Sequence, residues 1–234
     1  MMIFQEYLNL KDMHEEKPIL AIETSQNLCS ACVYFSDEKF YELNMNLKNS
    51  HAEKLFEIID SVLKISGIKP NELDSIAVSA GPGSFTGLRI GMSAAKGIAF
   101  GAKLPIIPVP TFEAMAFQLS YFLPDATEFI IANKVNVEEI YYAKFQIKSN
   151  NYIFAENLDI ITRDEFRKKT NHELVFGNAV TESEKSKRHS ISSPSSFYVA
   201  RWGKMFGEKF KIIDYDFLEP NYLKNFIVKD RKND

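Results

Sequence analysis

A glycine-rich segment constrains the fold of this chain more than any other part of its sequence. Residues 79–101 read SAGPGSFTGLRIGMSAAKGIAFG and hold six of the ten glycines. A strand-like run, Asp74–Val78, precedes the segment, and the residues from Ser84 to Gly101 follow a helical pattern. Because each glycine inside a helix costs about 1 kcal/mol relative to alanine, such a helix needs a closely packed neighbour or a ligand at its start.

Composition and charge limit the classes of protein to which this chain can belong. The 234 residues are 45% hydrophobic, which allows one large or two small domains, and a net charge of −3 argues against unaided nucleic-acid binding. No apolar run reaches the roughly 18 residues of a membrane span. Met1–Glu16 has no apolar core of a secretory signal, and Met13 is an alternative start that would leave Met1–Asp12 outside the native protein.

Two cysteines, Cys29 and Cys32, lie in a predicted strand over residues 28–35. Residues three apart on a strand point to opposite faces, so this pair suits neither a disulfide nor a shared metal. We expect two packing residues in a protein of the reducing cytoplasm.

The first half of the chain, residues 17–110, predicts a sheet with two helices. We expect a three-stranded meander and then a capping box at Ser50 and Glu53 that opens a helix to Ile65. The predicted strands are 18–22, 28–35, 40–47 and 74–79, and the predicted helices are 51–65 and 84–101.

Prolines 105, 108 and 110 mark the best domain boundary, so residues 111–228 form a second domain whose last helix is expected to pack back on the first. We set residues 1–16 apart as an extension and residues 229–234 as a frayed tail. The predicted helices are 111–122, a short one opened by Thr162 with Glu165, and 196–210; the predicted strands are 128–132, 139–147, 152–155 and 172–176.

The two helices of the first domain carry more apolar surface than one face needs. Gly87, Gly91 and Ala95 recur every four residues and form a smooth groove that another helix could approach closely. Two interpretations stay open: a partner interface, or burial within the same domain. The candidate interface residues are Leu55, Ile58, Ile59, Val62, Gly87, Ile90, Gly91, Ala94, Ala95 and Ile98.

The turn before the second helix offers an anion site. Backbone N–H groups of Ser84, Phe85 and Thr86 at a helix start favour a phosphate, and Arg89 could assist. The alternative is structural, with Gly81 and Gly83 making the turn and Ser84 capping the helix. The chain contains no Walker A, G-x-G-x-x-G, G-x-S-x-G or H-E-x-x-H pattern. Sequence motifs therefore do not support a nucleotide site, a hydrolase nucleophile or a metal site.

Three strings in a fixed order carry a resemblance: ILAIETS at 19–25, NSHAEKL at 49–55 and AGPGSFTGLRIG at 80–91. The chain resembles the TsaB (YeaZ) family of bacterial tRNA threonylcarbamoyladenosine synthesis. EEIY at 138–141 and PNYLK at 220–224 support this more weakly. The resemblance implies an α/β fold of two lobes, of the actin/Hsp70/sugar-kinase type, with each lobe related to ribonuclease H.

The resemblance also implies a function without catalysis. The chain would be a scaffold and activating subunit that pairs with the related transferase, TsaD, and recruits an ATPase subunit, TsaE. That complex modifies adenosine 37 of tRNAs reading codons that begin with A, so tRNA would be met only through the complex. Alone, the chain would form a homodimer, and either dimer would use the two helices at 51–66 and 84–101.

Two features of the sequence bear on catalysis. The related transferase carries a metal-binding H-x-x-x-H pair where this chain has Thr111 and Met115, so the resemblance implies neither metal nor cofactor. A rival hypothesis is an actin-fold ATPase or kinase whose nucleotide would meet Glu23, Thr24, Ser25, Gly81, Gly83, Ser84, Thr86 and Arg89. Glu23, in place of the family's aspartate, weakens the ATPase hypothesis. The segment Lys134–Asn136 also departs from the family's D-A-R pattern. A metallopeptidase is the least favoured interpretation.

Overall fold

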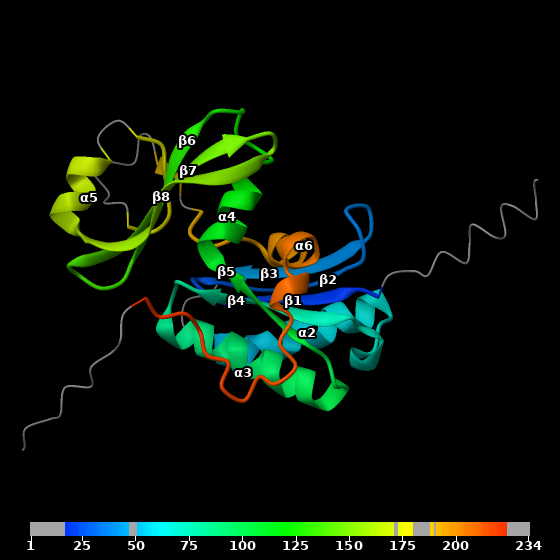
Figure 1. Ribbon diagram of the computed structural model, residues 1–234. Coiled ribbons are helices and arrows are strands. Elements are labelled where there is room, and N and C mark those ends of the chain that lie inside the picture. The colour runs from blue at the N-terminus through cyan, green and yellow to red at the C-terminus, as the bar shows by residue number, and fades with distance from the viewer. Residues whose placement is uncertain (1–16, 47–50, 171–172, 180–187, 190, 224–234) are drawn as a thin grey trace, which may run out of the picture.

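The computed structural model describes residues 17–46, 51–170, 173–179, 188–189 and 191–223. Two five-stranded sheets form two lobes, and two helices, α4 and α6, lie between them (Figure 1). The two-lobed α/β fold predicted from the sequence is therefore confirmed. Residues 1–16, the cap at Ser50 and the tail at 229–234, all of which entered the sequence predictions, lie outside the described residues.

The first sheet has the strand order β3-β2-β1-β4-β5. The predicted meander is confirmed, since β1 pairs antiparallel with β2 and β2 pairs antiparallel with β3, whereas β1, β4 and β5 run parallel. The all-apolar β1 suits a strand that is buried on both faces. The bounds are Ile19–Glu23 for β1, Leu28–Tyr34 for β2, Phe40–Asn46 for β3, Ser75–Gly81 for β4 and Ile106–Pro110 for β5.

The second sheet repeats this plan. Its order is β10-β9-β6-β7-β8, with β6, β7 and β8 antiparallel and β6, β9 and β10 parallel, so both sheets share one strand order and one set of directions. Strand β8 continues well beyond the predicted 152–155. The bounds are Glu128–Lys134 for β6, Glu139–Lys148 for β7, Asn151–Thr162 for β8, Val175–Phe176 for β9 and Arg188–His189 for β10.

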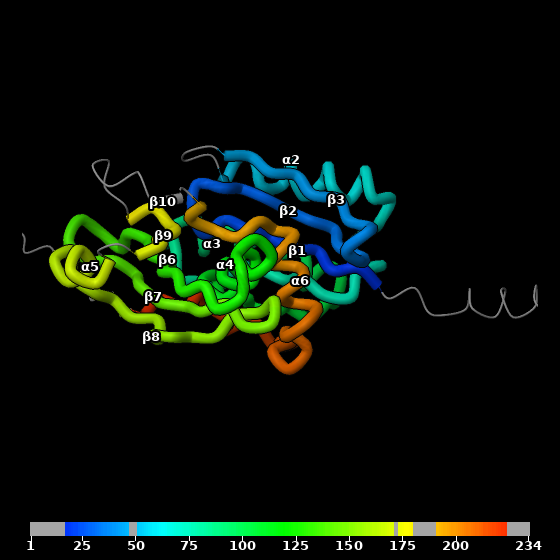
Figure 2. The backbone as a smooth tube through the Cα atoms, turned by 90° about the horizontal axis from the view of Figure 1, so that it is seen from above, coloured from blue at the N-terminus to red at the C-terminus, as the bar shows by residue number. Residues whose placement is uncertain are grey.

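Helices cover both faces of the first sheet. Helices α2 (His51–Ser66) and α3 (Phe85–Ala102) lie on one face, and α6 (Ser196–Phe206) lies on the other (Figures 1 and 2). Cys29 packs in the core under α2 and α3, and Cys32 packs in the core under α6. The prediction that the two cysteines face opposite sides is confirmed, and both are free.

Each of the two helices between the lobes packs against the lobe opposite to the one that it follows in the chain. Helix α4 (Thr111–Leu119) leaves the first sheet and buries Phe112, Met115 and Leu119 in the core of the second lobe. Helix α6 returns from the second lobe and packs Val199, Ala200 and Trp202 on the first sheet. Both helices are shorter than predicted, and α6 is followed by a short 3-10 helix, η4 (Glu208–Phe210). Two further elements are η2 (Pro70–Glu72) and α5 (Arg163–Lys169), whose capping box at Thr162 and Glu165 is confirmed.

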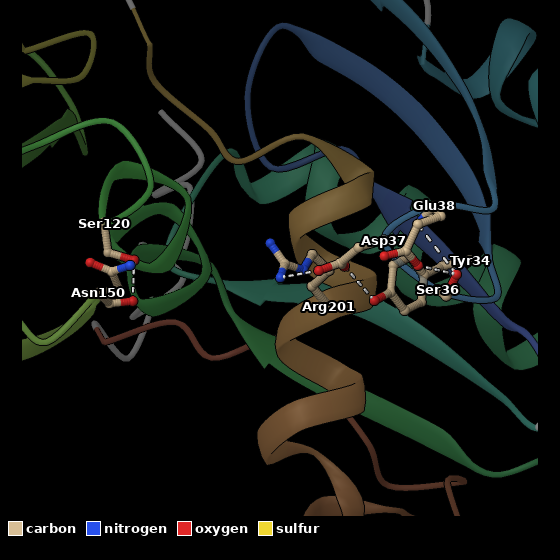
Figure 3. A network of polar contacts seen from close by, with 7 residues as sticks. All are labelled: Tyr34, Ser36, Asp37, Glu38, Ser120, Asn150 and Arg201. Carbon is tan, nitrogen blue, oxygen red and sulfur yellow. Dashed lines mark hydrogen bonds and ion pairs between the residues drawn. The ribbon is translucent and has the colours of Figure 1, made fainter.

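Arg201 fastens α6 to the first lobe (Figure 3). Its guanidinium donates to Asp37 at 2.6 Å, and the Tyr34 hydroxyl donates to the other Asp37 oxygen at 2.7 Å. The guanidinium carbon also lies 4.4 Å from the ring centroid of Tyr121, just after α4. Because the Arg201 guanidinium is both ion-paired with Asp37 and stacked on Tyr121, it holds α6 in one position between the β2–β3 turn and α4.

Within the described residues, no helix combines the length and apolar character that crossing a bilayer requires.

Two glycines of α3 give a matched test of this packing. A Cβ at Gly87 would lie 2.1 Å from the Thr24 carbonyl oxygen, whereas a Cβ at Gly97 would meet no atom within 4 Å. We expect Gly87→Ala to lower the free energy of unfolding by about 1–3 kcal/mol through overpacking against backbone. Gly97→Ala should raise the free energy by up to about 1 kcal/mol through helix propensity. Urea unfolding measures both, and equal effects of the two substitutions would contradict the packing described.

Candidate functional site

The turn between β4 and α3 has the purely structural form that was predicted as the alternative to an anion site. A cis peptide bond joins Gly81 and Pro82, and Gly81 has a φ of 111°, which favours glycine. Ser84 is the N-cap of α3, and its hydroxyl accepts a hydrogen bond from the Gly87 N–H at 3.3 Å. The cap and the turn are therefore as predicted.

The start of α3 lies directly on the carboxyl end of β1. The Ser84 N–H donates to the Ser25 carbonyl at 2.7 Å, and the Thr24 hydroxyl donates to the Gly87 carbonyl at 2.8 Å. A Cβ at Gly83 would lie 2.6 Å from the Ser25 carbonyl oxygen, and one at Gly91 would lie 2.3 Å from the Thr24 hydroxyl oxygen. These glycines thus serve a close approach between helix and strand inside the chain.

The Glu23 carboxyl group, at the end of β1, is enclosed by Ser25 and by Ser79 of β4. One carboxyl oxygen accepts from the N–H and the hydroxyl of Ser25, each at 2.5 Å, and the other accepts from the Ser79 hydroxyl. The side chain is fully buried, and burial raises the pKa of Glu23 from 4.5 to about 7 against the lowering effect of these hydrogen bonds. A carboxyl group so enclosed cannot reach a metal ion or a nucleotide in this conformation.

A pocket of about 360 Å³ opens at the start of α3, between the lobes. Arg89 stays outside it: its guanidinium carbon lies 4.0 Å from the Phe85 ring centroid, and its Nε donates to the Tyr222 hydroxyl at 3.0 Å. The pocket is lined by Gln26, Gly83, Ser84, Phe85, Thr86, Lys134, Val135, Tyr141 and Tyr222.

Three of the eight residues predicted for an anion site line this pocket: Gly83, Ser84 and Thr86. Glu23, Thr24 and Ser25 are fully buried beneath it, and Gly81 packs on the Asn221 carbonyl. Lys134 and Tyr141 belong to the second lobe, and sequence reasoning missed them as pocket residues because only the fold brings the lobes together. One feature of the sequence pointed to Lys134, because this residue lies in the segment that departs from the family's D-A-R pattern.

The residues predicted as a partner surface need correction. Eight of the ten are buried in the N-terminal core, and only Ile90 and Ile98 keep partial exposure. Substituting Gly91 or Ala95 would therefore perturb the fold of the lobe before it tested association. The eight buried residues are Leu55, Ile58, Ile59, Val62, Gly87, Gly91, Ala94 and Ala95.

A different set of residues faces outward from the same two helices. Phe56 and Phe100 are 59% and 80% exposed, and a Cβ at Gly97 or Gly101 would meet no atom within 4 Å. Ser93, Gly97 and Gly101 recur every four residues on nearly the opposite side of the helix from Gly87, Gly91 and Ala95. This second small-residue stripe was visible in the sequence. We call the following set the outer α2–α3 surface: Phe56, Ser93, Gly97, Phe100 and Gly101, together with Leu63 and Ile90, which are half-buried and also pack against the core.

The positions compared with a metal-binding histidine pair have structural roles. The Thr111 hydroxyl accepts from the Gly81 N–H at 3.1 Å, and Met115 is buried in the second lobe. In the parts of the chain that the structure describes, no three His, Cys, Asp or Glu side chains gather as metal ligands would.

Comparisons with known proteins place these features in a family. The profile described as "TsaD: tRNA N6-adenosine threonylcarbamoyltransferase" matches residues 46–201. The tRNA threonylcarbamoyladenosine biosynthesis protein TsaB of Haemophilus influenzae is 36% identical over 126 residues, which cover 54% of this chain and 52% of that protein. Its namesake in Escherichia coli K12 is 32% identical over 149 residues, 63% of each chain. The chain thus spans between half and two thirds of these relatives.

A solved structure shares the fold over nearly its whole length. The protein from Pseudomonas aeruginosa described as similar to peptidase YEAZ has a TM-score of 0.74 at 19% identity, covering 89% of this chain and 100% of that one. At this identity the likeness concerns the fold alone.

The burial of Glu23 predicts a specific pH dependence of stability. The folded pKa of about 7 lies above the ordinary 4.5, so the stabilisation is fully present below about pH 4.5 and is lost as the pH rises through 7. Glu23→Gln cannot ionise. We expect the free energy of unfolding of the native chain, relative to this variant, to fall by roughly 3 kcal/mol over that window.

Denaturant unfolding at several pH values measures this difference. Glu57→Gln changes an exposed glutamate on α2 whose carboxylate pairs with Lys54 of the same helix, and it is the control. Because an exposed pair of this kind contributes little to stability, this variant should stay close to the native chain over the same pH window. Parallel curves for Glu23→Gln and the native chain would contradict the prediction.

Proposed function

The chain belongs to the TsaD family, and we propose that within it the chain is a TsaB (YeaZ)-like member: a partner-binding subunit of tRNA threonylcarbamoyladenosine synthesis that does no catalysis of its own. The outer α2–α3 surface is the observation that carries the proposal. Exposed Phe100 beside the stripe of Ser93, Gly97 and Gly101, with exposed Phe56 on α2, would let the backbone of a neighbouring helix come close and bury aromatic area. Burying one such phenylalanine contributes about 1.5–3 kcal/mol before association costs.

The proposed partner is a TsaD-like transferase, held by helix-to-helix packing. The family profile that this chain matches is described as that transferase, so two related chains would meet through equivalent helices. A homodimer in the absence of the transferase follows from the same surface, since related helices can substitute for one another. Recruitment of a TsaE-like ATPase, and contact with tRNA through the complex only, complete the proposal.

The lack of catalysis is supported by what the chain's polar groups already do. Thr111 supports the turn at Gly81, and Glu23 is enclosed by Ser25 and Ser79. The contribution to the reaction would be binding free energy that favours the active conformation of the transferase. The proposed compartment is the reducing cytoplasm, supported by two buried free cysteines on opposite faces of one sheet.

Adding a bulky side chain to the small-residue stripe should abolish association. We expect Gly97→Leu to weaken binding to the TsaD-like transferase by at least ten-fold, because the added side chain would hold the helices apart, while the lone chain stays folded. Isothermal titration or co-elution measures binding, and reconstituted threonylcarbamoylation of tRNA measures its consequence.

Lys168→Leu provides the matched control for this experiment. It adds the same side chain to an exposed position on α5 in the second lobe and should leave binding unchanged. Normal association of a folded Gly97→Leu variant would overturn the placement of the surface, and modification of tRNA by the transferase without this chain would overturn the function.

The rival ATPase or kinase hypothesis keeps one supporting observation, the pocket at the start of α3 with Lys134 on its far wall. We expect isothermal titration of the lone chain with MgATP to show no micromolar binding and no turnover, because Glu23 is enclosed and cannot hold the metal ion. Micromolar binding that Lys134→Ala removes, with hydrolysis, would favour the enzyme instead.

A further inference from the structure

A larger pocket lies on the opposite side of the first sheet from α2 and α3. It has a volume of about 490 Å³, within the range of small-molecule sites, and forms where α4, β8, α6 and η4 meet. It takes no part in the function proposed above. Its lining residues are Pro110, Glu113, Tyr152, Trp202, Met205, Phe206, Glu208, Lys209 and Phe210.

Aromatic rings form one wall of the pocket. The Trp202 ring lies 5.6 Å from Phe206 and stacks at 21° on Phe210, with 5.9 Å between centroids. Phe210 is 42% exposed and Met205 is 56% exposed, so the wall is open to an incoming group. The faces of such rings carry negative potential and attract cations.

An oriented carboxylate faces this wall. The indole N–H of Trp202 donates to the Tyr152 hydroxyl at 3.0 Å, and that hydroxyl donates to Glu113 at 2.9 Å. Burial raises the pKa of Tyr152 well above its ordinary value, so the hydroxyl remains a donor at neutral pH. This relay fixes one oxygen of Glu113, and no second hydrogen bond or ion pair to Glu113 is found among the described residues.

A cation of the chain itself already lies against the aromatic wall. Lys209, from η4, places its ammonium nitrogen 4.9 Å from the Phe210 centroid. The other acid at the rim, Glu208, pairs with Lys211 at 2.8 Å, which leaves Glu113 as the carboxylate next to the rings. An aromatic wall with a held carboxylate repels anions and gives a neutral guest no ionic partner.

We propose that this pocket binds an organic cation, an alkyl guanidinium or ammonium group whose charge meets Glu113 and whose stem packs on Phe206 and Phe210. The volume exceeds that of the charged head alone, so the aliphatic stem is part of what is recognised. Such a group occurs in free amines and in arginine or lysine side chains of another protein, and the experiment separates these sources.

Trp202 reports on occupancy because it is the only tryptophan of the chain. Titration of the full chain with agmatine, which carries a guanidinium and an ammonium group at opposite ends of a butyl stem, should give a saturable change in tryptophan fluorescence at millimolar concentration or below. Pentanol, a neutral chain of similar length, and glutarate, an anion, should give none at the same concentration and ionic strength. An equal response to pentanol, or no saturable response to agmatine up to about 10 mM, overturns the proposal.

Two substitutions are expected to act in opposite directions. Glu113→Gln keeps an acceptor for Tyr152 but removes the charge, and should weaken agmatine binding about ten-fold or more. Lys209→Ala removes the competing cation and should tighten binding by a few-fold. Glu57→Gln, on α2, is the control that should change nothing, and thermal melting verifies that each variant is folded. Unchanged affinity in a folded Glu113→Gln variant overturns the role of the carboxylate.

The source of the cation is read from a second titration with the blocked tripeptide acetyl-Leu-Arg-Leu-amide. Binding more than ten-fold tighter than that of agmatine identifies a protein segment as the natural guest. Equal or weaker binding identifies a free amine. Both outcomes require loss of affinity in Glu113→Gln, and a peptide that binds equally well to that variant contradicts the proposal.

Discussion

The contact between the end of β1 and the first turns of α3 is the constraint on which the rest of the structure depends. Gly83 and Gly87 have no Cβ, so the β4–α3 turn and the first turn of α3 lie against the backbone of Ser25 and Thr24, and Gly91 leaves room for the Thr24 hydroxyl. That approach sets the rotation of α3 about its axis. Once this rotation is set, every other residue of the helix has its face assigned.

One helix thus carries two small-residue stripes with different tasks. The inner stripe joins helix to strand within the lobe, and the outer stripe at Ser93, Gly97 and Gly101 leaves room beside exposed Phe100. A helix that is hydrophobic or small on most of its circumference is buried on most sides. The segment that suggested a phosphate loop therefore packs closely on its inner side, and its outer side is the one that we propose for a partner helix.

The sequence predicted the elements of the first lobe well, because local patterns determine them. The meander, the cap at Ser84 and the opposite faces of Cys29 and Cys32 follow from strand and cap geometry, and all were found. Periodicity could not say which flank of a mostly apolar helix is buried, since that depends on the Thr24 contact from another element. Nor could it foresee the pocket that Lys134 and Ser84 line together, or the aromatic pocket around Trp202, because both combine residues that lie far apart in the chain.

The exchange of helices between the lobes has a consequence for the order in which the chain can fold. The face of the first sheet that bears Ala21, Cys32, Ala77 and Ile107 is covered by α6, which is synthesised after the whole second sheet. As the chain leaves the ribosome, this apolar face stays uncovered until about residue 206 has emerged. The first lobe therefore cannot complete its core as an independent unit, and a chain interrupted before α6 would present a surface for chaperones or aggregation.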